Sequence, residues 1–553
     1  MSVILYDTSL RDGTQGEGIQ LSVDDKLEIA RLLDGLGIRY VEGGWPGSNP
    51  RDEEFFQKAR GGLRLGQARL TAFGATRRAG IPCEEDSNLA ALLDSGVGVL
   101  TIFGKAWRFQ ATEALRITPE ENLELIEDSV RYLKARVDEV IFDAEHFFDG
   151  YLDDPEYAFA ALEAAERGGA DWLVLCDTNG GTLPHALEAA VRATRARVKK
   201  PLGIHTHNDS EVAVANSLAA VAAGATMVQG TLNGCGERCG NANLVSIIPG
   251  LKLKLGIDCV TDAQLATLRH VARTFDEVTN RTPWGTQPYV GQSAFAHKGG
   301  VHVDAVEKNS RTYEHIDPAA VGNHRRVLLS DLSGRMNVQL KAKELGVELD
   351  PKSADTRRIL GRLKEMENQG YQFESAGASF KLFIDECLNR RPRYFTLRDL
   401  ELQVGFGDGR NGSARTDGEA RVRIELDVGG EVAYTSAIGD GPVHALDVGL
   451  RGLVDKFYPT LKPVRLVDYK VRVITTGEGT GSVVRVLIQS SDGDEEWGTV
   501  GVSPNIIRAS WNAMLDALDY KLVKEGIAPY VSRQGQSERP PLRTGTGDSP
   551  TDR

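Results

Sequence analysis

The stretch Pro201-Leu-Gly-Ile-His205-Thr-His207-Asn-Asp209 indicates both the fold and the chemistry of this chain. Mostly apolar residues lead into two histidines, as at the end of a buried strand. Side chains two residues apart on a β-strand point to the same face, so both imidazoles can reach one point. Two imidazoles that converge on one point are typical of a metal site. Two unrelated histidines at a strand end are the alternative, and the rest of the chain decides between them.

Apolar runs alternate with helical patterns on either side of this stretch. The predicted strands are residues 3–9, 40–44, 69–74, 99–104, 139–147, 172–178, 202–208 and 227–233. Helical patterns lie between them, for example at 119–136, 155–168 and 184–198. Eight strand–helix units predict an α/β fold, a closed (β/α)8 barrel of the TIM type. A doubly wound open sheet is the alternative, but no Gly-x-Gly-x-x-Gly turn follows the first strand.

Polar side chains gather where the predicted strands end, and such barrels carry their chemistry at that end. These residues are Arg11, Asp12, Asp143, Glu145, His146, Asp177, Thr178, Asn179, Glu237 and Asn241. Asp12, His205 and His207 then provide three ligands for a metal with open coordination positions, as in catalytic sites. Cys235 and Cys239 lie in the same region and could be thiolate ligands. We favour buried structural thiols, because the oxygen and imidazole ligands are sufficient.

Length and composition exclude several classes of function. The 553 residues predict several domains, and a net charge of −13 without a basic stripe argues against nucleic-acid binding. Six cysteines without a Cys-x-x-Cys pair predict a reducing, cytoplasmic environment, and the first residues show no signal-peptide pattern. The uncharged run 212–236 contains several amides and glycines, which predicts a buried helix and strand rather than a membrane span.

The barrel is predicted over residues 1–255, and a repeated pattern occupies 396–530. Predicted strands at 397–406, 420–428 and 431–438 precede a helix at about 442–456, and strands at 466–475, 482–489 and 496–502 precede a helix at 506–523. Two βββα units predict an α+β domain. Residues 256–395 begin as a helix-rich linker. Residues 531–553 have almost no large apolar side chain and predict a disordered tail.

Three motifs carry a family resemblance. Leu10-Arg-Asp-Gly-Thr-Gln15, His205-Thr-His-Asn-Asp209 and Gly236-Glu-Arg-Cys-Gly-Asn241 resemble, in this order, the signatures of the isopropylmalate and homocitrate synthase family. Four further stretches, 45–56, 143–150, 176–182 and 322–326, resemble its citramalate synthase branch. Two residues depart from the signatures, since the family commonly has Glu at the position of Thr14 and Gly at that of Glu211.

The resemblance implies a metal-dependent acyltransferase that condenses acetyl-CoA with pyruvate in a Claisen reaction and hydrolyses the thioester. A divalent ion (Zn, Mn, Mg or Co) would bind the keto acid and polarise its carbonyl group. The implied metal ligands are Asp12, His205, His207 and Asn241. The implied substrate-binding residues are Arg11, Thr178, Asn179 and Asp304, and the implied catalytic residues are Arg11, Glu145, Glu237, His302 and Tyr313. Glu145 is one candidate for the base that deprotonates the acetyl methyl group, and His302 paired with Glu237 is the alternative. The resemblance further implies that residues 256–395 include a lid subdomain, in which Gly299 and Gly300 suit the mobility of a lid.

The repeat resembles the regulatory domain of this family, so we expect a homodimer with isoleucine as a feedback effector. A dimerisation module without a ligand is the alternative. Two alternatives belong to the same class of enzyme, isopropylmalate synthase and homocitrate synthase. Two belong to other classes: a lyase or carboxyltransferase with a similar barrel, and a non-catalytic amino-acid sensor on an inactive barrel. The repeat favours a synthase. The presence of Arg11, Asp12, Glu145, His205 and His207 argues against an inactive barrel.

Overall fold

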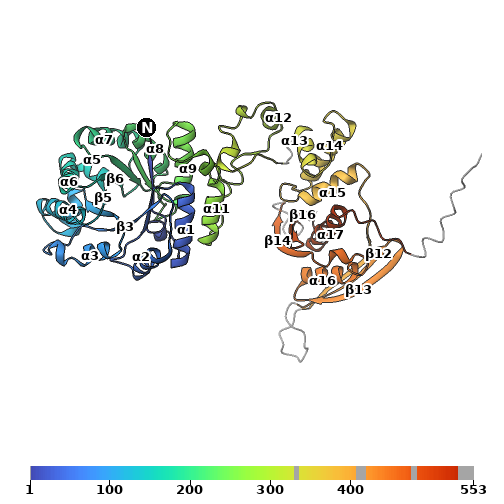
Figure 1. Cartoon of the computed structure of the whole chain (residues 1–553). Helices are drawn as coiled ribbons and strands as arrows, with labels where there is room; N and C mark the ends of the chain where they lie inside the picture. Colours follow the sequence, from blue (N-terminus) through green and yellow to red (C-terminus); the bar gives the residue numbers. More distant parts are fainter. Residues whose placement is uncertain (1, 329–334, 406–418, 475–481, 533–553) are drawn as a thin grey trace, which may run out of the picture. The chain divides into compact units, whose positions relative to one another are not determined.

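The computed structural model describes residues 2–328, 335–405, 419–474 and 482–532. These residues form two compact units (Figure 1). The first unit comprises Met1–Ala296 and Glu314–Arg326, and the second comprises His297–Tyr313 and Val327–Arg553. The predicted tail lies outside the described residues from 533 onward. The predicted domain boundaries at 255 and 395 stay predictions.

Parallel strands β1 to β8 close into a barrel in chain order, which confirms the predicted (β/α)8 fold. The strands are β1 Ile4–Asp7, β2 Tyr40–Gly44, β3 Arg69–Ala75, β4 Val99–Lys105, β5 Glu139–Glu145, β6 Trp172–Asp177, β7 Leu202–Thr206 and β8 Met227–Gly230. The predicted strands run two or three residues too far at the carboxyl ends of β1, β5, β7 and β8, where the loops that carry the polar residues begin.

Helices surround the barrel (Figure 1). They are α1 Val23–Leu36, α2 Pro50–Gly62, α3 Ser87–Asp94, α4 Pro119–Lys134, α5 Phe147–Asp153, α6 Pro155–Gly168, α7 Pro184–Arg197 and α8 Ala213–Ala223. Local sequence fixes where they start: Ser22 and Asp25 form a capping box before α1, and α2, α4, α6 and α7 begin with proline. The uncharged run forms α8 and β8, and none of the helices in the described part of the chain is long and apolar enough to cross a membrane.

Two apolar layers position the site. The larger one packs the strands against the surrounding helices. A smaller cluster consists of Tyr6, Tyr40, Val99, Ile141, Val174, Cys176 and Met227, one or two from each of six strands. Its member Cys176 also lines the cavity at the carboxyl end of the barrel, where the polar residues gather.

The first unit continues with α9 Leu244–Pro249, α10 Asp262–Leu265 and α11 Leu268–Val278. The short strands β9 Ala296–His297 and β10 Arg326–Val327 form a pair. The second unit contains the helices α12 Gly300–Lys308, α13 Arg335–Glu344, α14 Ala354–Asn368 and α15 Gly377–Cys387.

Two antiparallel sheets complete the second unit. Strands β11 Thr396–Val404, β12 Ala420–Val428 and β13 Glu431–Gly439 precede α16 Pro442–Val454, and strands β14 Arg465–Val473, β15 Val484–Ser491 and β16 Glu496–Ser503 precede α17 Ile506–Lys524. The predicted pair of βββα units is therefore confirmed. The helices cover the sheets through a shared core that includes Trp497 and Trp511.

Candidate metal centre and active site

The structure brings Asp12, His205 and His207 together at the carboxyl end of the barrel. All three are buried, and one ligand atom of each lies within 4.8 Å of the others. The Nε2 atom of His205 lies 3.3 Å from His207 Nε2 and 3.3 Å from Asp12 Oδ2. His207 follows the last residue of β7 and forms a β-bridge with Asn241. This bridge places the Asn241 Nδ2 atom 2.8 Å from Asp12 Oδ2, so the Asn241 amide lies beside the three converging side chains.

These donors fit a divalent cation. A carboxylate and imidazoles suit several first-row metals and Mg²⁺, and no other group of His, Cys, Asp and Glu with this spacing occurs among the described residues. The Oδ1 atom of Asn241 and the Nδ1 atom of His207 are buried without a hydrogen-bond partner. Such orphaned atoms are uncommon in folded proteins, and the Asn241 Oδ1 would become a ligand atom if the amide turned over.

The surrounding charges and burial favour the deprotonated, metal-binding form of Asp12 and His207. Burial alone would raise the pKa of Asp12, but Arg11 and the two histidines hold it well below its usual range. Burial, and then the charge of His205, lowers the pKa of His207 to about 4, so this imidazole is neutral at physiological pH. Burial alone would lower the pKa of His205, but its hydrogen bond to Asp12 and the Asp12 charge raise it above the ordinary value.

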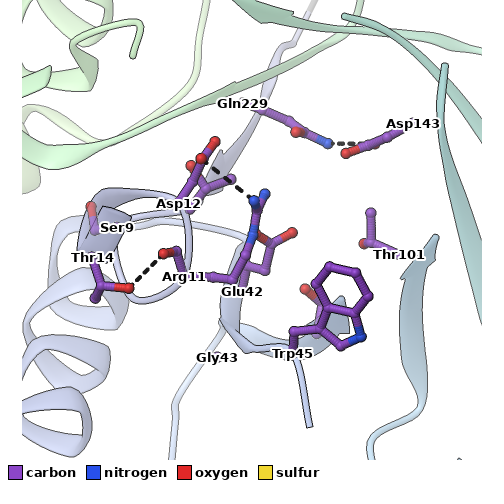
Figure 2. Close-up of polar contacts among 12 residues, drawn as sticks. Ser9, Arg11, Asp12, Thr14, Glu42, Gly43, Trp45, Thr101, Asp143 and Gln229 are labelled. Carbon is purple, nitrogen blue, oxygen red and sulfur yellow. Dashed lines mark hydrogen bonds and ion pairs between the residues drawn. The ribbon is translucent and has the colours of Figure 1, made fainter. Parts of the chain in front are cut away.

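A buried relay fixes the orientation of His205. Its Nδ1 lies 2.9 Å from Gln229 Oε1, and the Gln229 amide donates to Asp143 Oδ1 at 3.0 Å (Figure 2). Because Nδ1–H donates to Gln229, the Nε2 atom is the one that faces the candidate metal position. Burial raises the pKa of Asp143 to about 7. We did not predict Gln229 as a site residue; the available signal was an amide in an otherwise apolar strand.

Arg11 is held rigidly at the edge of the centre (Figure 2). Its Nε donates to Glu42 Oε1 at 2.5 Å, its Nη1 lies 3.5 Å from Asp12 Oδ1, and its guanidinium lies 3.8 Å from the centre of the Phe73 ring. Glu42 is fully buried in β2 and also accepts a hydrogen bond from Tyr6 at 2.6 Å. Sequence reasoning missed Glu42, although a charged residue within a buried strand is a signal of a buried ion pair.

A cavity of about 210 Å³ lies beside these residues. An aromatic wall, formed by Trp45, Phe73 and Phe103, lines it together with Arg11, Asp12, Gln15, Asp143, Glu145, Cys176, Thr178, His205, His207, Glu237 and Arg238. The Phe73 and Phe103 rings stack with their centres 5.4 Å apart, and Trp45 meets both edge-on. The Trp45 indole donates to Asn88 at 2.7 Å, which fixes its position. The cavity is therefore small, rigid and apolar on one side.

Glu145 lines the cavity as expected, and its carboxylate forms an ion pair with Lys105. Sequence reasoning missed Lys105, which ends β4. The Thr178 hydroxyl accepts a hydrogen bond from the backbone N–H of His146 at 2.8 Å. Glu237 lines the cavity from the loop after β8 and lies 3.3 Å from Arg238, whose guanidinium donates to Asp209 and to the Thr178 carbonyl.

Other residues implied by the resemblance lie outside this cavity. The Asn179 amide donates to Asp149 at 3.1 Å, and Asn179 does not line the cavity. His302, Asp304 and Tyr313 belong to the second unit. There the His302 and Tyr313 rings stack with their centres 4.2 Å apart, and Asp304 pairs with Lys308 at 2.6 Å. Their roles stay predictions.

The two departures from the family signatures have local explanations. The Thr14 hydroxyl donates to the Arg11 carbonyl at 2.6 Å and so supports the turn that carries Arg11 and Asp12 (Figure 2). Glu211 has a φ of 59°, in the left-handed region that favours glycine. The Gly common at this position in the family would therefore adopt the same backbone more easily. The Cys235 thiol is buried and Cys239 is exposed, and neither belongs to the group of candidate metal ligands.

Comparison with known proteins agrees with this architecture. Residues 2–274 match the HMGL-like family, residues 289–371 match the homocitrate synthase post-HMGL domain-like family, and residues 375–522 match the LeuA allosteric (dimerisation) domain. The barrel and the repeated βββα domain thus each correspond to a known family.

Full-length relatives narrow the assignment. The chain is 53% identical to an (R)-citramalate synthase from Geobacter sulfurreducens over 95% of this chain and 98% of that protein. It is 51% identical to an (R)-citramalate synthase from Aquifex aeolicus, with the same coverage of both chains. A 2-isopropylmalate synthase from Methanocaldococcus jannaschii is 28% identical over 94% of this chain and 95% of that protein. At this identity over nearly its whole length, the chain belongs to the (R)-citramalate synthase family.

Proposed function

We propose that this chain condenses acetyl-CoA with pyruvate and hydrolyses the thioester, which yields (R)-citramalate and CoA. Relatives of 45–53% identity with this activity in their names support the proposal. One structural observation carries it at the level of chemistry: a buried carboxylate and two imidazoles meet beside Arg11 in a cavity of about 210 Å³ with an aromatic wall. Such a cavity suits a small keto acid.

The residues around the cavity provide separate parts of the chemistry. A divalent metal bound by Asp12, His205, His207 and Asn241 would act as a Lewis acid toward the keto acid. Arg11 keeps its positive charge in the cavity, because Glu42 and the Phe73 ring fix its position. It can stabilise the negative charge that develops on the keto oxygen when the acetyl carbon attacks. The Thr178 hydroxyl, already held by His146 N–H, can donate to the substrate carboxylate.

A base must remove one proton from the acetyl methyl group before the new C–C bond forms. Glu145 is the candidate in the cavity. Its carboxylate pairs with Lys105, and it must turn from this ion pair toward the substrate to accept the proton. After the condensation, water attacks the thioester carbonyl, and the CoA sulfur leaves as the thiol once it gains a proton. His302 with Glu237 remains the alternative base.

The aromatic wall supports pyruvate as the keto acid. The methyl group of pyruvate is small and apolar, and the stacked rings of Phe73 and Phe103 offer it an apolar surface at the cavity. A rigid pocket rejects a bulkier side chain by steric overlap. This argument disfavours 2-isopropylmalate synthase, which would have to admit an isopropyl group, and homocitrate synthase, which would have to admit a second carboxylate.

The remaining proposals concern regulation. The match of residues 375–522 to an allosteric dimerisation domain supports a homodimer with an amino-acid effector. Because citramalate leads toward isoleucine, isoleucine is the effector that we propose, and the chain would serve isoleucine biosynthesis. This assignment depends on pyruvate as substrate.

A thiol-release assay with a panel of keto acids tests the proposed reaction. Purified enzyme with acetyl-CoA should release CoA fastest with pyruvate and much more slowly with 2-oxoisovalerate and 2-oxoglutarate, and mass spectrometry should identify citramalate. Equal or higher kcat/KM with 2-oxoisovalerate would instead assign 2-isopropylmalate synthase. The same assay after chelation should show no activity, and full activity without bound metal would refute the metal centre.

A further inference from the structure

A second cavity lies in the first unit and shares no lining residue with the cavity of the metal centre. Its volume is about 260 Å³, and its walls are α11 and the segment 283–292. The Asn233 amide donates to the Ala272 carbonyl and to Asp276 Oδ1, both at 2.8 Å. Asn233 belongs to the loop that leaves β8 and ends at Asn241 of the metal centre. The second cavity therefore lies beside the loop that completes the active site.

Positive charge gathers at this cavity. Arg269 and Arg273 line it from successive turns of α11. His324 Nδ1 lies 3.3 Å from Arg269 Nη1, and the Arg326 guanidinium donates to the carbonyl of Gln292, another lining residue. His324 and Arg326 come from the stretch 322–326 that resembles the citramalate synthase branch. The guanidinium groups of Arg269, Arg273 and Arg326 thus gather at one hollow, and His324 can accept a hydrogen bond from Arg269.

The arginines outnumber the one acidic side chain of the lining, Asp276. Arg273 pairs with no acidic side chain among the described residues, and the Nε atom of Arg269 is buried without a hydrogen-bond partner. Burial, and then the charges of Arg273 and Arg326, lower the pKa of Arg269. Asp276 is the acidic residue in the lining, but its Oδ1 already accepts a hydrogen bond from Asn233. These observations indicate that the arginines of this cavity can bind an anion.

The rest of the wall suits an aromatic base. Trp284 lines the cavity and is 61% exposed, which leaves its indole face available for stacking. The opposite part of the wall is held in place, because the Asn323 amide donates to the carbonyls of Tyr289 and Gly291 at 2.9 and 3.1 Å. The cavity is therefore formed before any ligand binds, with arginines and an exposed indole in the same lining.

We propose that this cavity binds the phosphorylated adenosine end of a CoA thioester, with Arg269 and Arg273 on the 3′-phosphate and Trp284 against the adenine. The inference rests on the proposed use of acetyl-CoA. Phosphate and a planar base are the two chemical groups that guanidinium and indole side chains recognise best. A free nucleotide has the same groups, so the test must distinguish the two sources.

Calorimetry on the full chain tests the site without turnover, with adenosine 3′,5′-bisphosphate, CoA, dephospho-CoA and inorganic phosphate as ligands. In the unmodified chain, CoA should bind at least tenfold more tightly than dephospho-CoA, which lacks the 3′-phosphate. Arg273→Gln and the pair Arg269→Gln with Arg273→Gln should remove that difference. Trp284→Ala should weaken adenosine 3′,5′-bisphosphate but not inorganic phosphate. Arg31 is an exposed arginine of α1, and Arg31→Gln is the matched control. It should change the affinity for none of the four ligands.

Arg273 is exposed, so its replacement should leave the melting temperature unchanged even if replacement of Arg269 disturbs folding. Arg273→Gln should also raise the KM for acetyl-CoA at least tenfold and leave the KM for pyruvate and the bound metal unchanged. If Arg273→Gln still binds CoA more tightly than dephospho-CoA, the site is refuted. If the arginines matter for adenosine 3′,5′-bisphosphate but not for CoA, the ligand is a free nucleotide and the CoA assignment is overturned. If the enzyme makes no citramalate but still binds adenosine 3′,5′-bisphosphate through Arg269 and Arg273, the proposed reaction is refuted and the cavity remains an adenosine-phosphate site.

Discussion

At the scale of single residues, Gln229 determines how His205 can bind a metal. The Gln229 carbonyl accepts from His205 Nδ1, and its amide donates to Asp143. Gln229→Leu removes both bonds, so the imidazole can rotate or change tautomer. Loss of such a supporting bond typically lowers metal affinity about 10- to 100-fold. Competition titration with a fluorescent chelator measures it. Thr101→Val, which removes a buried hydrogen bond to Tyr6 instead, should leave metal affinity unchanged.

Metal affinity should also depend on pH through His205. Its hydrogen bond to Asp12 and the Asp12 charge raise its pKa above the ordinary value, so in the metal-free protein the imidazole keeps its proton to a higher pH than a free histidine does. A metal must displace that proton, and affinity should rise with pH by up to about tenfold per pH unit until the raised pKa is passed. His207 adds no slope there, because its pKa of about 4 keeps it neutral. Calorimetry in buffers of different ionisation enthalpy counts the released proton; constant affinity between pH 6 and 8 would contradict this assignment.

Kinetics can distinguish Glu145 from His302 as the base. Glu145→Gln keeps the shape of the side chain but cannot accept the methyl proton, so kcat should fall about 100- to 10,000-fold while substrate binding is nearly kept. Single-turnover assays and substrate titrations measure the two effects. Lys105→Gln, which frees the Glu145 carboxylate, should leave more activity than Glu145→Gln. If His302→Ala has the large kcat effect and Glu145→Gln does not, the base lies in the second unit.

The sequence pointed to the candidate metal ligands but not to the residues that support them, for a physical reason. Asp12, His207 and Asn241 follow strand ends and His205 lies one residue before the end of β7, all in polar motifs that no apolar core explains. Gln229 and Glu42 lie inside strands, and their partners are on other strands, so only the closed barrel shows that they meet. Lys105 looks like an ordinary strand-terminal cation until Glu145 of the next strand lies beside it.

At the scale of elements, the alternating pattern was sufficient for the barrel but not for the loops. Buried parallel strands read as short apolar runs, and caps such as Ser22 mark the helices between them. The predicted strand 227–233 is too long because the chain folds back after Gly230. A Cβ atom on Gly230 would lie 2.4 Å from the Ala242 carbonyl, and Asn233 has a φ of 55°. Such close approaches between segments that are distant in the chain cannot be predicted from the local sequence.

Adjacent strands β3 and β4 supply the two phenylalanines of the aromatic wall, which predicts how specificity can be changed. Phe103→Ala should open space beside the keto acid while Phe73 still supports Arg11. The ratio of kcat/KM for 2-oxobutanoate to that for pyruvate should rise about tenfold, since one methylene in an apolar pocket is worth about 1–3 kcal/mol. Steady-state kinetics on both acids measures it. Phe103→Leu should give an intermediate ratio, and an unchanged ratio in both variants would show that the wall does not contact the side chain.

At the scale of the whole molecule, the two βββα units of the second unit are not equivalent. Sheet β14–β16 packs against α17, and α15 contacts both α17 and the edge strand β16, where Val500 joins the core that contains Phe380 and Phe383. Sheet β11–β13 has α16 on one face only. On its other face Val432, Tyr434 and Ile438 are 41, 77 and 55% exposed, and no described element covers them. This open face is the surface that a second copy of the chain can bury.

The open face predicts how the proposed homodimer can be broken. Tyr434→Lys together with Ile438→Lys places two charges where apolar contact is expected, so the dissociation constant should rise at least tenfold, a change of about 1.4 kcal/mol or more. Sedimentation over a range of concentrations measures it. Val448→Lys on α16, which is 41% exposed within the same unit, is the matched control and should leave the dimer intact. A dimer that tolerates the double change would place the interface elsewhere.

Feedback by isoleucine should depend on the same assembly. Coupling between an effector and an active site is typically about 1–3 kcal/mol, which predicts partial to strong rather than complete inhibition. Linkage then requires reciprocity: if isoleucine weakens acetyl-CoA binding, acetyl-CoA must weaken isoleucine binding by the same factor. Calorimetric titration of each ligand in the absence and presence of the other measures both factors. The Tyr434→Lys, Ile438→Lys variant should lose inhibition and retain its metal. Leucine as the only effector would favour isopropylmalate as the product, and no heat and no inhibition with either amino acid would leave the repeat as a dimerisation module.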